Sequence, residues 1–429
     1  MNIVVISQYW HPDMNIPERR WQWLTRLLIE NGHSVTVIAP PPHSARASQS
    51  EARPLVEEIG PCGETILRTK YLPLGHSILQ RSISQASVGL YSLLRALGSE
   101  GLRNSRRPDL IIGTVPALPT APVTQLIAKI LRVPYVIDLR DAWPDLLRQA
   151  RQWNEGVGTP SLHDRILNSG PMNLVERAAR LIMYQTFRSA VGIMVTSQRL
   201  EEALRNNPHL QRNGKIPHIT TIRNTFPPSI DRVPPRADCN ADHGVLHVLY
   251  AGKVGRAQKL GNAISAARIC VERGIPIQLC IVGKGAAFDS VRRSAVDLRD
   301  HVTFCEHVEL DELDRFYQWA DTCLVHLTSW EPFERTVPSK TYELMELGKH
   351  ISAVVQGETA QIIIEKGAGH AVSPEDPQAL ANLWENLVKY PSLLTPEPAA
   401  KQWVLQERLV SNPERFLDFI AALTPNQHQ

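Results

Sequence analysis

The feature that most constrains the fold of this chain is a repeated alternation of short apolar runs and helical stretches. Residues 2–7 (NIVVIS) form a continuous Val- and Ile-rich run, and residues 17–30 place their apolar side chains on one helical face. Uniformly apolar strands that are each followed by a helix are typical of a parallel sheet covered on both faces. The pattern therefore predicts an α/β fold. Similar runs recur at residues 34–39, 110–113, 135–138 and 192–196 and, after a proline-rich stretch, restart at residues 245–251.

This restart indicates two domains. We expect two Rossmann-like doubly wound domains that face each other across a cleft, at residues 1–225 and 243–400, although an ordinary loop could produce the same break. The last helical pattern, residues 411–423, is expected to pack back on the first domain, with Ser411 or Asn412 as its cap.

The charge balance of the chain limits its partners. Its 46 Lys and Arg residues against 43 Asp and Glu residues leave a net charge of +3, too small for a protein that coats nucleic acid. An apolar content of 43% is enough for globular cores. The six cysteines include no CxxC pair, so we expect free thiols rather than zinc ligands or a disulfide framework.

Two stretches bear on a membrane. Residues 110–128 carry no charge, but Pro116, Pro119 and Pro122 interrupt them, so we expect a strand, a loop and a helix there rather than a membrane span. Residues 74–107 mix apolar residues with five arginines and one acid, which suits either an anionic lipid surface or an internal helix with a solvated basic edge. No signal-peptide pattern is present, so the expected location is cytoplasmic, with attachment to the inner face of the plasma membrane left open.

The first turn of the chain offers polar groups but no glycine. Residues 7–18 (SQYWHPDMNIPE) lack the GxGxxG pattern that lets a dinucleotide approach the backbone, which argues against a nicotinamide or flavin dehydrogenase. His11, Asp13 and Asn15 are candidate acceptor-binding residues, although a plain surface loop explains each of them equally well.

A glycine-containing turn follows the first strand of the second half. Gly252 and Gly255 allow close backbone approach, and three cations near a helix N-terminus suit a phosphate, although solvated side chains would give the same pattern. Gly283 begins a weaker repeat of this strand, turn and helix order. The three cations are Lys253, Arg256 and Lys259.

Residues 337–349 (VPSKTYELMELGK) suggest another anion site. Pro338 at a helix start leaves the amides of Ser339 and Lys340 directed outward. Glu343 lies one turn further in, where its carboxylate could accept hydrogen bonds from a ribose diol. A glutamate favoured by the helix dipole is the alternative explanation.

Six segments in this order give the chain a resemblance to a known family. They are VVISQYWHPD (4–13), VPYVIDLRDAWPD (133–145), IRNTFPPS (222–229), YAGKVGRAQKL (250–260), VPSKTYELMELGK (337–349) and GETAQIIIEKGAGHAVSPEDPQAL (357–380). The chain resembles the retaining glycosyltransferases of family 4, which have the two-domain GT-B fold. It is similar to the branch that transfers amino sugars in bacterial polysaccharide and O-antigen assembly. The resemblance implies a nucleotide-sugar donor in the C-terminal domain, with UDP favoured, and a glycan or lipid-linked acceptor in the N-terminal domain.

The resemblance assigns donor-site residues by position. Lys253 stands where the family has a diphosphate-binding Arg, and Gln258 stands where it has a Lys. Glu343 matches the ribose-binding second Glu of the family's Glu-x7-Glu motif, whose first Glu is replaced by Arg335. His307 lies in the loop that flanks the nucleobase in this fold, although a buried structural histidine is an equally good explanation.

Arg140 and Asp141 follow a predicted strand end, where many family members have a cleft histidine. Arg140 is expected to bind donor phosphate or the hexose and Asp141 to orient the acceptor hydroxyl, with a loop-bracing ion pair as the alternative. Together with Lys253 they form the expected catalytic set. The resemblance implies no protein nucleophile, because the leaving diphosphate can accept the proton of the acceptor.

The sequence also bears on cofactors and on alternative functions. No DxD pair has the context of a metal site, so neither a metal nor another cofactor is expected beyond the nucleotide sugar. A sugar-nucleotide epimerase of the same fold and a non-catalytic nucleotide-sugar-binding protein remain alternatives.

Overall fold

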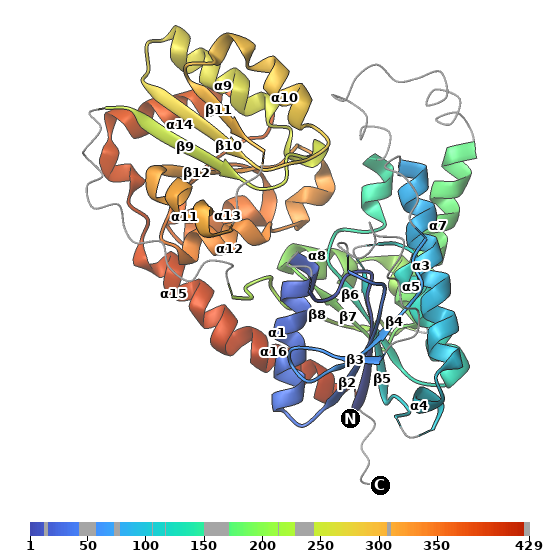
Figure 1. Ribbon diagram of the computed structural model, residues 1–429. Coiled ribbons are helices and arrows are strands. Elements are labelled where there is room, and N and C mark those ends of the chain that lie inside the picture. The colour runs from blue at the N-terminus through green and yellow to red at the C-terminus, as the bar shows by residue number, and fades with distance from the viewer. Residues whose placement is uncertain are drawn as a thin grey trace. The chain divides into compact units, whose positions relative to one another are not determined.

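The chain forms two compact units in the computed structural model (Figure 1). Unit 1 consists of Met1–Pro144, Leu174–Pro227 and Val410–Gln429, and unit 2 consists of Asp145–Asn173 and Pro228–Leu409. Unit 1 is therefore assembled from stretches that are far apart in sequence. The structure describes residues 1–12, 16–42, 57–72, 78–104, 106–115, 117–149, 171–212, 214–227, 244–306 and 310–423.

Unit 1 contains an eight-stranded sheet in the order β3-β4-β2-β1-β5-β6-β7-β8. All neighbouring strands are parallel except β3 and β4. Because β1 lies between β2 and β5, the strand order reverses there, as in a doubly wound sheet. The strands are β1 (Asn2–Ile6), β2 (Ser34–Ala39), β3 (Glu57–Ile59), β4 (Thr65–Arg68), β5 (Leu110–Val115), β6 (Tyr135–Leu139), β7 (Gly192–Val195) and β8 (His218–Thr221).

Helices cover both faces of this sheet. On one face, α1 (Ile16–Glu30) and α16 (Asn412–Ala422) bury Trp21 and Phe419 in a shared apolar cluster. Gly192 in β7 makes room for α16, because a Cβ there would lie 2.5 Å from the Phe419 ring. The other face is covered by α3 (Ile78–Gly98), α4 (Glu100–Arg103), α5 (Thr120–Leu131), α7 (Pro171–Ser189) and α8 (Gln198–Arg205).

Unit 2 contains a six-stranded parallel sheet in the order β11-β10-β9-β12-β13-β14. Its strand order reverses between β9 and β12, so this sheet is also doubly wound. The strands are β9 (Leu246–Ala251), β10 (Ile277–Val282), β11 (Val302–Cys305), β12 (Thr322–His326), β13 (His350–Val354) and β14 (Gly369–Val372).

Two helical layers enclose the sheet of unit 2. One apolar cluster joins it to α9 (Gly261–Glu272), α10 (Phe288–Ser294) and α14 (Pro377–Lys389). A second cluster on the opposite face joins it to α11 (Leu310–Trp319), α12 (Ser339–Glu346), α13 (Gly357–Glu365) and α15 (Pro398–Gln406). Cysteines 62, 270, 280, 305 and 323 are free, as the cysteine spacing predicted for the chain.

Ser411 stands at the N-cap position of the last helix, as the sequence predicted, but the expected side-chain capping bond is not formed. Residues 407–411 form a π-helical turn that leads directly into α16, and Ser411 makes no side-chain capping bond. The Asn412 side chain is used elsewhere, since its Oδ1 accepts the amide of Arg223 at 3.1 Å and its Nδ2 donates to the Thr225 hydroxyl at 2.7 Å. The Asn412 side chain thus links the start of α16 to the segment after β8.

Strands β13 and β14 carry a histidine pair. Nε2 of His350 lies 2.9 Å from Nδ1 of His370, and Nδ1 of His350 lies 2.8 Å from the Thr322 hydroxyl. Burial, with a smaller effect of His370, lowers the pKa of His350 to about 3, and burial also lowers the pKa of His370. Both rings are therefore held in the neutral form.

We expect unit 2 to lose stability as the pH falls below about 6.5. The unfolded histidines titrate near that pH, so the unfolded chain binds more protons than the folded chain between pH 6.5 and about 3. In His350→Gln, the loss of unfolding free energy between pH 7 and pH 5 should shrink by about 2 kcal/mol. Urea titrations at both pH values measure this, with the exposed His209→Gln as control. If the unaltered protein and both variants lost the same unfolding free energy between pH 7 and pH 5, His350 would not be held in the neutral form.

Candidate functional site

Three loops of unit 2 meet where its strand order reverses. They follow β9, β10 and β12, and backbone hydrogen bonds connect them at the carboxyl ends of these strands. The amide of Val254 donates to the carbonyl of Lys284 at 2.9 Å, and the amide of Thr328 donates to the carbonyl of Ala257 at 2.9 Å. Open α/β sheets bind their ligands beyond such a reversal.

The glycines of these loops are required by contact between backbones. Gly283 has a φ of +136°, and a Cβ there would lie 1.9 Å from the carbonyl oxygen of Gly252. A Cβ on Gly285 would lie 2.0 Å from the carbonyl oxygen of Val254. Gly283 was predicted as a donor-binding residue, and the structure shows it holding the β9 and β10 loops together.

We expect Gly283→Ala to destabilise unit 2 by at least about 2 kcal/mol, because alanine adds both backbone strain and a clash. The matched control is Gly261→Ala at the start of α9, where a Cβ would meet nothing within 4 Å. That variant should be neutral or slightly stabilising. Thermal unfolding of both proteins measures the difference, and similar melting temperatures would refute the close approach of the two loops.

The cations of the β9 loop fall into two groups. The side chains of Lys253 and Arg256 form no hydrogen bond or ion pair within the described part of the chain, and Nε of Arg256 is buried without an acceptor. Nζ of Lys259, in contrast, lies 2.9 Å from a carboxylate oxygen of Glu375. Oε1 of Gln258 accepts the amide of Gly255 at 3.1 Å. Lys253 and Arg256 can therefore meet an anion, while Lys259 and Gln258 brace the loop.

Glu375 connects this loop to the end of β12. Its carboxylate accepts hydrogen bonds from the hydroxyls of Ser329 at 2.7 Å and Thr328 at 3.0 Å. Its hydrogen bonds with Lys259 and then Ser329 lower the pKa of Glu375 to about 2. This carboxylate therefore stays charged and fixes Lys259 in place.

The start of α12 contributes further polar groups to unit 2. Pro338 precedes the helix and no side chain caps it, so the amides of Ser339 and Lys340 are the open donors expected at a helix N-terminus. Nζ of Lys340 donates to the Tyr317 hydroxyl at 2.9 Å and to Oε1 of Glu343 at 3.2 Å.

Arg335 lies in the 3-10 turn before α12. Its guanidinium pairs with Asp145 at 3.0 Å and also with Glu331. Its charge is thus compensated within the chain. Among the described residues, no group of three or more His, Cys, Asp or Glu side chains is arranged to hold a metal ion.

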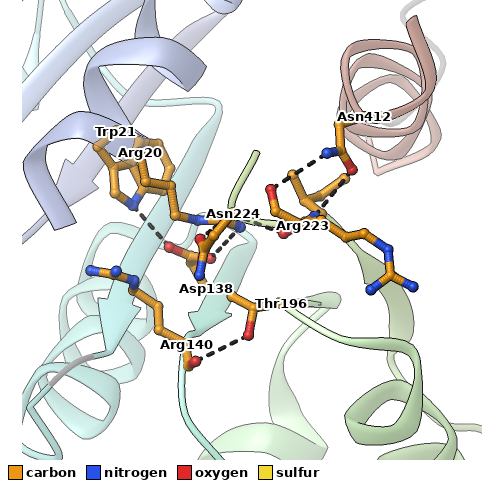
Figure 2. A network of polar contacts seen from close by, with 9 residues as sticks. Arg20, Trp21, Asp138, Arg140, Thr196, Arg223, Asn224 and Asn412 are labelled. Atoms are coloured by element: carbon orange, nitrogen blue, oxygen red, sulfur yellow. Dashed lines mark hydrogen bonds and ion pairs between the residues drawn. The ribbon is translucent and has the colours of Figure 1, made fainter. Parts of the chain in front are cut away.

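A fully buried polar network surrounds the end of β6 in unit 1 (Figure 2). Asp138 accepts hydrogen bonds from Nη2 of Arg20 at 3.0 Å and from Nε1 of Trp21 at 2.9 Å. Nη1 of Arg20 also donates to the carbonyl of Ile222 at 2.8 Å and to Oδ1 of Asn224 at 3.0 Å. The side chains of Arg20 and Asp138 have no solvent exposure. This network ties α1, β6 and the segment after β8 together.

Arg140 extends from the same strand end (Figure 2). It is 8% exposed, and its Nε and Nη1 are buried without an acceptor in the described residues. Burial lowers the pKa of Arg140, while nearby Asp138 acts in the opposite direction. A buried guanidinium with unused donors costs free energy that a bound anion would recover. Asp141 follows directly, and its carbonyl accepts the amide of Trp143 at 2.7 Å.

Only part of the predicted acceptor loop lies within the described residues. His11 follows β1, and its carbonyl accepts Nη2 of Arg68 at 2.7 Å. Asp13 and Asn15 lie outside the described residues, as does His307.

Sequence reasoning missed several residues that hold the site. Arg20, Asp138 and Asn412 are buried polar residues, and Glu375 lies in a polar turn. A polar residue in an apolar stretch was an available signal only for Asp138, which lies in β6 (YVIDL). The hydrogen-bond partners of Arg20 and Asp138 lie 117 to 204 residues away, and Asn412 accepts the amide of Arg223 from 189 residues away, so no local spacing reveals them.

The fold and these sites define the class of this protein: two doubly wound α/β units, each with cationic groups beyond the ends of its strands. Residues 17–213 match the family model for a glycosyl transferase 4-like domain, and residues 246–389 match that for glycosyl transferases group 1. The chain belongs to family 4 of the glycosyltransferases, which have the GT-B fold, and it is a transferase enzyme, as its motifs predicted.

Known proteins agree with this membership. The chain is 33% identical to the probable glycosyltransferase WbjE of Pseudomonas aeruginosa over 141 residues, which is 32% of this chain and only 34% of that protein. It is 24% identical to the putative colanic acid biosynthesis glycosyl transferase WcaI of Escherichia coli K12 over 393 residues, covering 89% of this chain and 90% of WcaI.

Solved structures share the fold. Sucrose-phosphate synthase from Thermosynechococcus elongatus matches with a TM-score of 0.67 and 16% identity, over 98% of this chain and 99% of that chain. HepE from Anabaena, solved with UDP-glucose, matches with a TM-score of 0.62 and 14% identity over the same shares. The predicted fold class is confirmed.

Proposed function

We propose that this protein is a retaining glycosyltransferase that moves a hexose or N-acetylhexosamine from a nucleotide sugar to a glycan or lipid-linked glycan of the cell envelope. The observation that carries the proposal is the glycine-containing loop at the strand reversal of unit 2, where Lys253 and Arg256 have no anionic partner in the described chain. Two cations beside a helix N-terminus are suited to a diphosphate.

The donor and acceptor classes have support from similar proteins. HepE was solved with UDP and with UDP-glucose, which favours UDP as the nucleotide. WcaI is named for colanic acid biosynthesis, which favours a polysaccharide pathway. WaaB, a lipopolysaccharide outer core galactosyltransferase, has a similar fold, and its name favours a lipid-linked acceptor.

Each polar group then has a task. Lys253, Arg256 and the amides of Ser339 and Lys340 stabilise the negative charge of the departing diphosphate. Lys340 holds Oε1 of Glu343, which leaves Oε2 for the ribose. These roles place the nucleotide end of the donor on unit 2.

In unit 1, Arg140 binds an anionic group of a substrate, either the donor phosphate or the phosphate that links a lipid to its glycan. Asp141 orients the attacking hydroxyl. The leaving diphosphate accepts the proton of that hydroxyl on the face of attack, so the anomeric configuration is retained without a protein nucleophile. The charge on the leaving group is met by side chains and amides, and we propose that transfer needs no metal.

One experiment tests this function. The protein is incubated with UDP, GDP and dTDP sugars, with and without a lipid-linked acceptor, in the presence and absence of EDTA. We expect acceptor-dependent release of UDP, unchanged by EDTA, and an NMR spectrum of the product with the donor's anomeric configuration. Acceptor-free isomerisation would instead identify an epimerase, binding without turnover would identify a nucleotide-sugar-binding protein, and inversion would reject the retaining mechanism.

A further inference from the structure

Unit 1 carries a surface that the proposed chemistry does not use: the outer face of α5 and α7. Leu181 and Ile182 on α7 are 70% and 51% exposed, and Leu126 and Ile130 on α5 are 44% and 49% exposed. The inner faces of both helices pack against the sheet, and Thr186 of α7 contacts Gln125 of α5 at 3.3 Å. The exposed residues are therefore not part of the core.

Cations lie beside Leu181, which lines a basic hollow. Two adjoining hollows, of about 570 Å³ and 390 Å³, share Arg188 in their walls. The first is also lined by Lys129, Arg132 and Arg212, and the second by Arg177, Arg180 and His209. No Asp or Glu lines either hollow within the described residues. Glu176 of α7 lies nearby without lining either hollow, and it pairs with Arg180 at 3.2 Å.

Spacing aligns the two kinds of side chain on α7. The α7 residues that line the second hollow follow the spacing i, i+3, i+4, i+7, i+8, i+11, so they form one stripe along the helix. They are Arg177, Arg180, Leu181, Tyr184, Gln185 and Arg188. A soluble anion needs cations but no exposed leucines, whereas an anionic bilayer rewards both together.

We propose that the α5–α7 face docks on an anionic lipid bilayer. Leu181 and Ile182 enter the boundary between head groups and acyl chains, and Arg177 and Arg188 pair with lipid phosphates. α3 lies beside α5 (Figure 1) and extends the apolar part of the surface through Ile83, Leu90 and Leu94, which are 47%, 54% and 56% exposed.

This location differs from the basic face expected within residues 74–107. Arg106 of that stretch pairs with Glu57. The cations that accompany exposed apolar residues are contributed by α5, α7 and the segment before β8. Among the described residues, no helix is both long and apolar enough to cross a membrane.

The test uses the full chain and sedimentation with vesicles of equimolar phosphatidylcholine and phosphatidylglycerol. We expect Arg177→Glu/Arg188→Glu to lower the partition coefficient at least about thirty-fold. The matched control is Arg293→Glu/Arg299→Glu, which changes the net charge equally at an exposed basic hollow of unit 2. That control should change binding less than about twofold. Equal losses in both variants, or no vesicle binding by the unaltered protein, would overturn the proposal.

A second variant tests the apolar part. Leu181→Ser/Ile182→Ser should lower vesicle binding at least about tenfold, since both side chains leave water on docking. Both are exposed, so the melting temperature should not change. Normal vesicle binding by this variant would overturn the proposal. So would a result in which the unaltered protein is a dimer in solution and the variant is a monomer that no longer binds vesicles. The assay contains no donor or acceptor, so its outcome is independent of the proposed transferase reaction.

Discussion

Lys253→Ala is expected to lower kcat by about 10²- to 10³-fold, because under the proposed function it removes a positive charge that stabilises the departing diphosphate. The Lys253 side chain is exposed and makes no contact that supports the fold, since the Tyr250 hydroxyl binds the Lys253 carbonyl rather than its side chain. Unfolding should therefore be unchanged. Rates of nucleotide release at saturating donor and acceptor measure the effect.

Two controls sharpen this result. Lys253→Arg should retain most of the activity, because it preserves the charge and places there the residue that the family usually has. Lys401→Ala, which removes an exposed lysine from α15, should leave kcat unchanged. Near-normal transfer by Lys253→Ala would reject the phosphate site at the β9 loop.

Asp138→Ala is expected to destabilise unit 1 by about 3–5 kcal/mol, the usual cost of leaving a buried charge without its partner. The substitution leaves Arg20 buried without its ion-pair partner and Nε1 of Trp21 without an acceptor, and it removes the carboxylate that most opposes the lowering of the Arg140 pKa. Calorimetry of the full chain should show a separate, earlier transition for unit 1 while that of unit 2 is unchanged.

Asp297→Asn is the matched control, because it breaks an ion pair with Arg268 that is open to solvent. It should produce no measurable shift in melting. If Asp138→Ala melted like the unaltered protein, the network in Figure 2 would contribute little to stability. Arg140 would then have to be held by other contacts.

The fold was largely predictable because parallel strands buried on both faces leave an unmistakable apolar pattern. Runs such as residues 34–39 and 135–138 coincide with β2 and with all but the last residue of β6. Short elements were harder: β3 and β14 have only three and four residues, too few for a period to appear. The helical pattern at residues 411–423 corresponds to α16, which begins one residue later than expected and follows a π-helical turn.

The candidate site shows a different limit. The residue types around Lys253 indicated an anion, but they could not show that Lys259 is compensated by Glu375, which lies more than a hundred residues further along the chain. Likewise, Gly283 suggested ligand approach, whereas the close partner in the structure is another backbone. Local spacing reveals which chemistry is available, and tertiary contacts decide which groups remain available for it.

The position of α16 has a consequence for synthesis of the protein. Phe416, Phe419 and Ile420 complete the apolar cluster on one face of unit 1, and Asn412 secures the segment after β8 from 189 residues away. At about 5–20 residues per second, a ribosome needs roughly 10–40 s to make the intervening chain. During that interval α16 is not yet available to cover Gly192 and its neighbours. Unit 1, whose synthesis begins first, therefore completes its apolar cluster only after unit 2 has been synthesised.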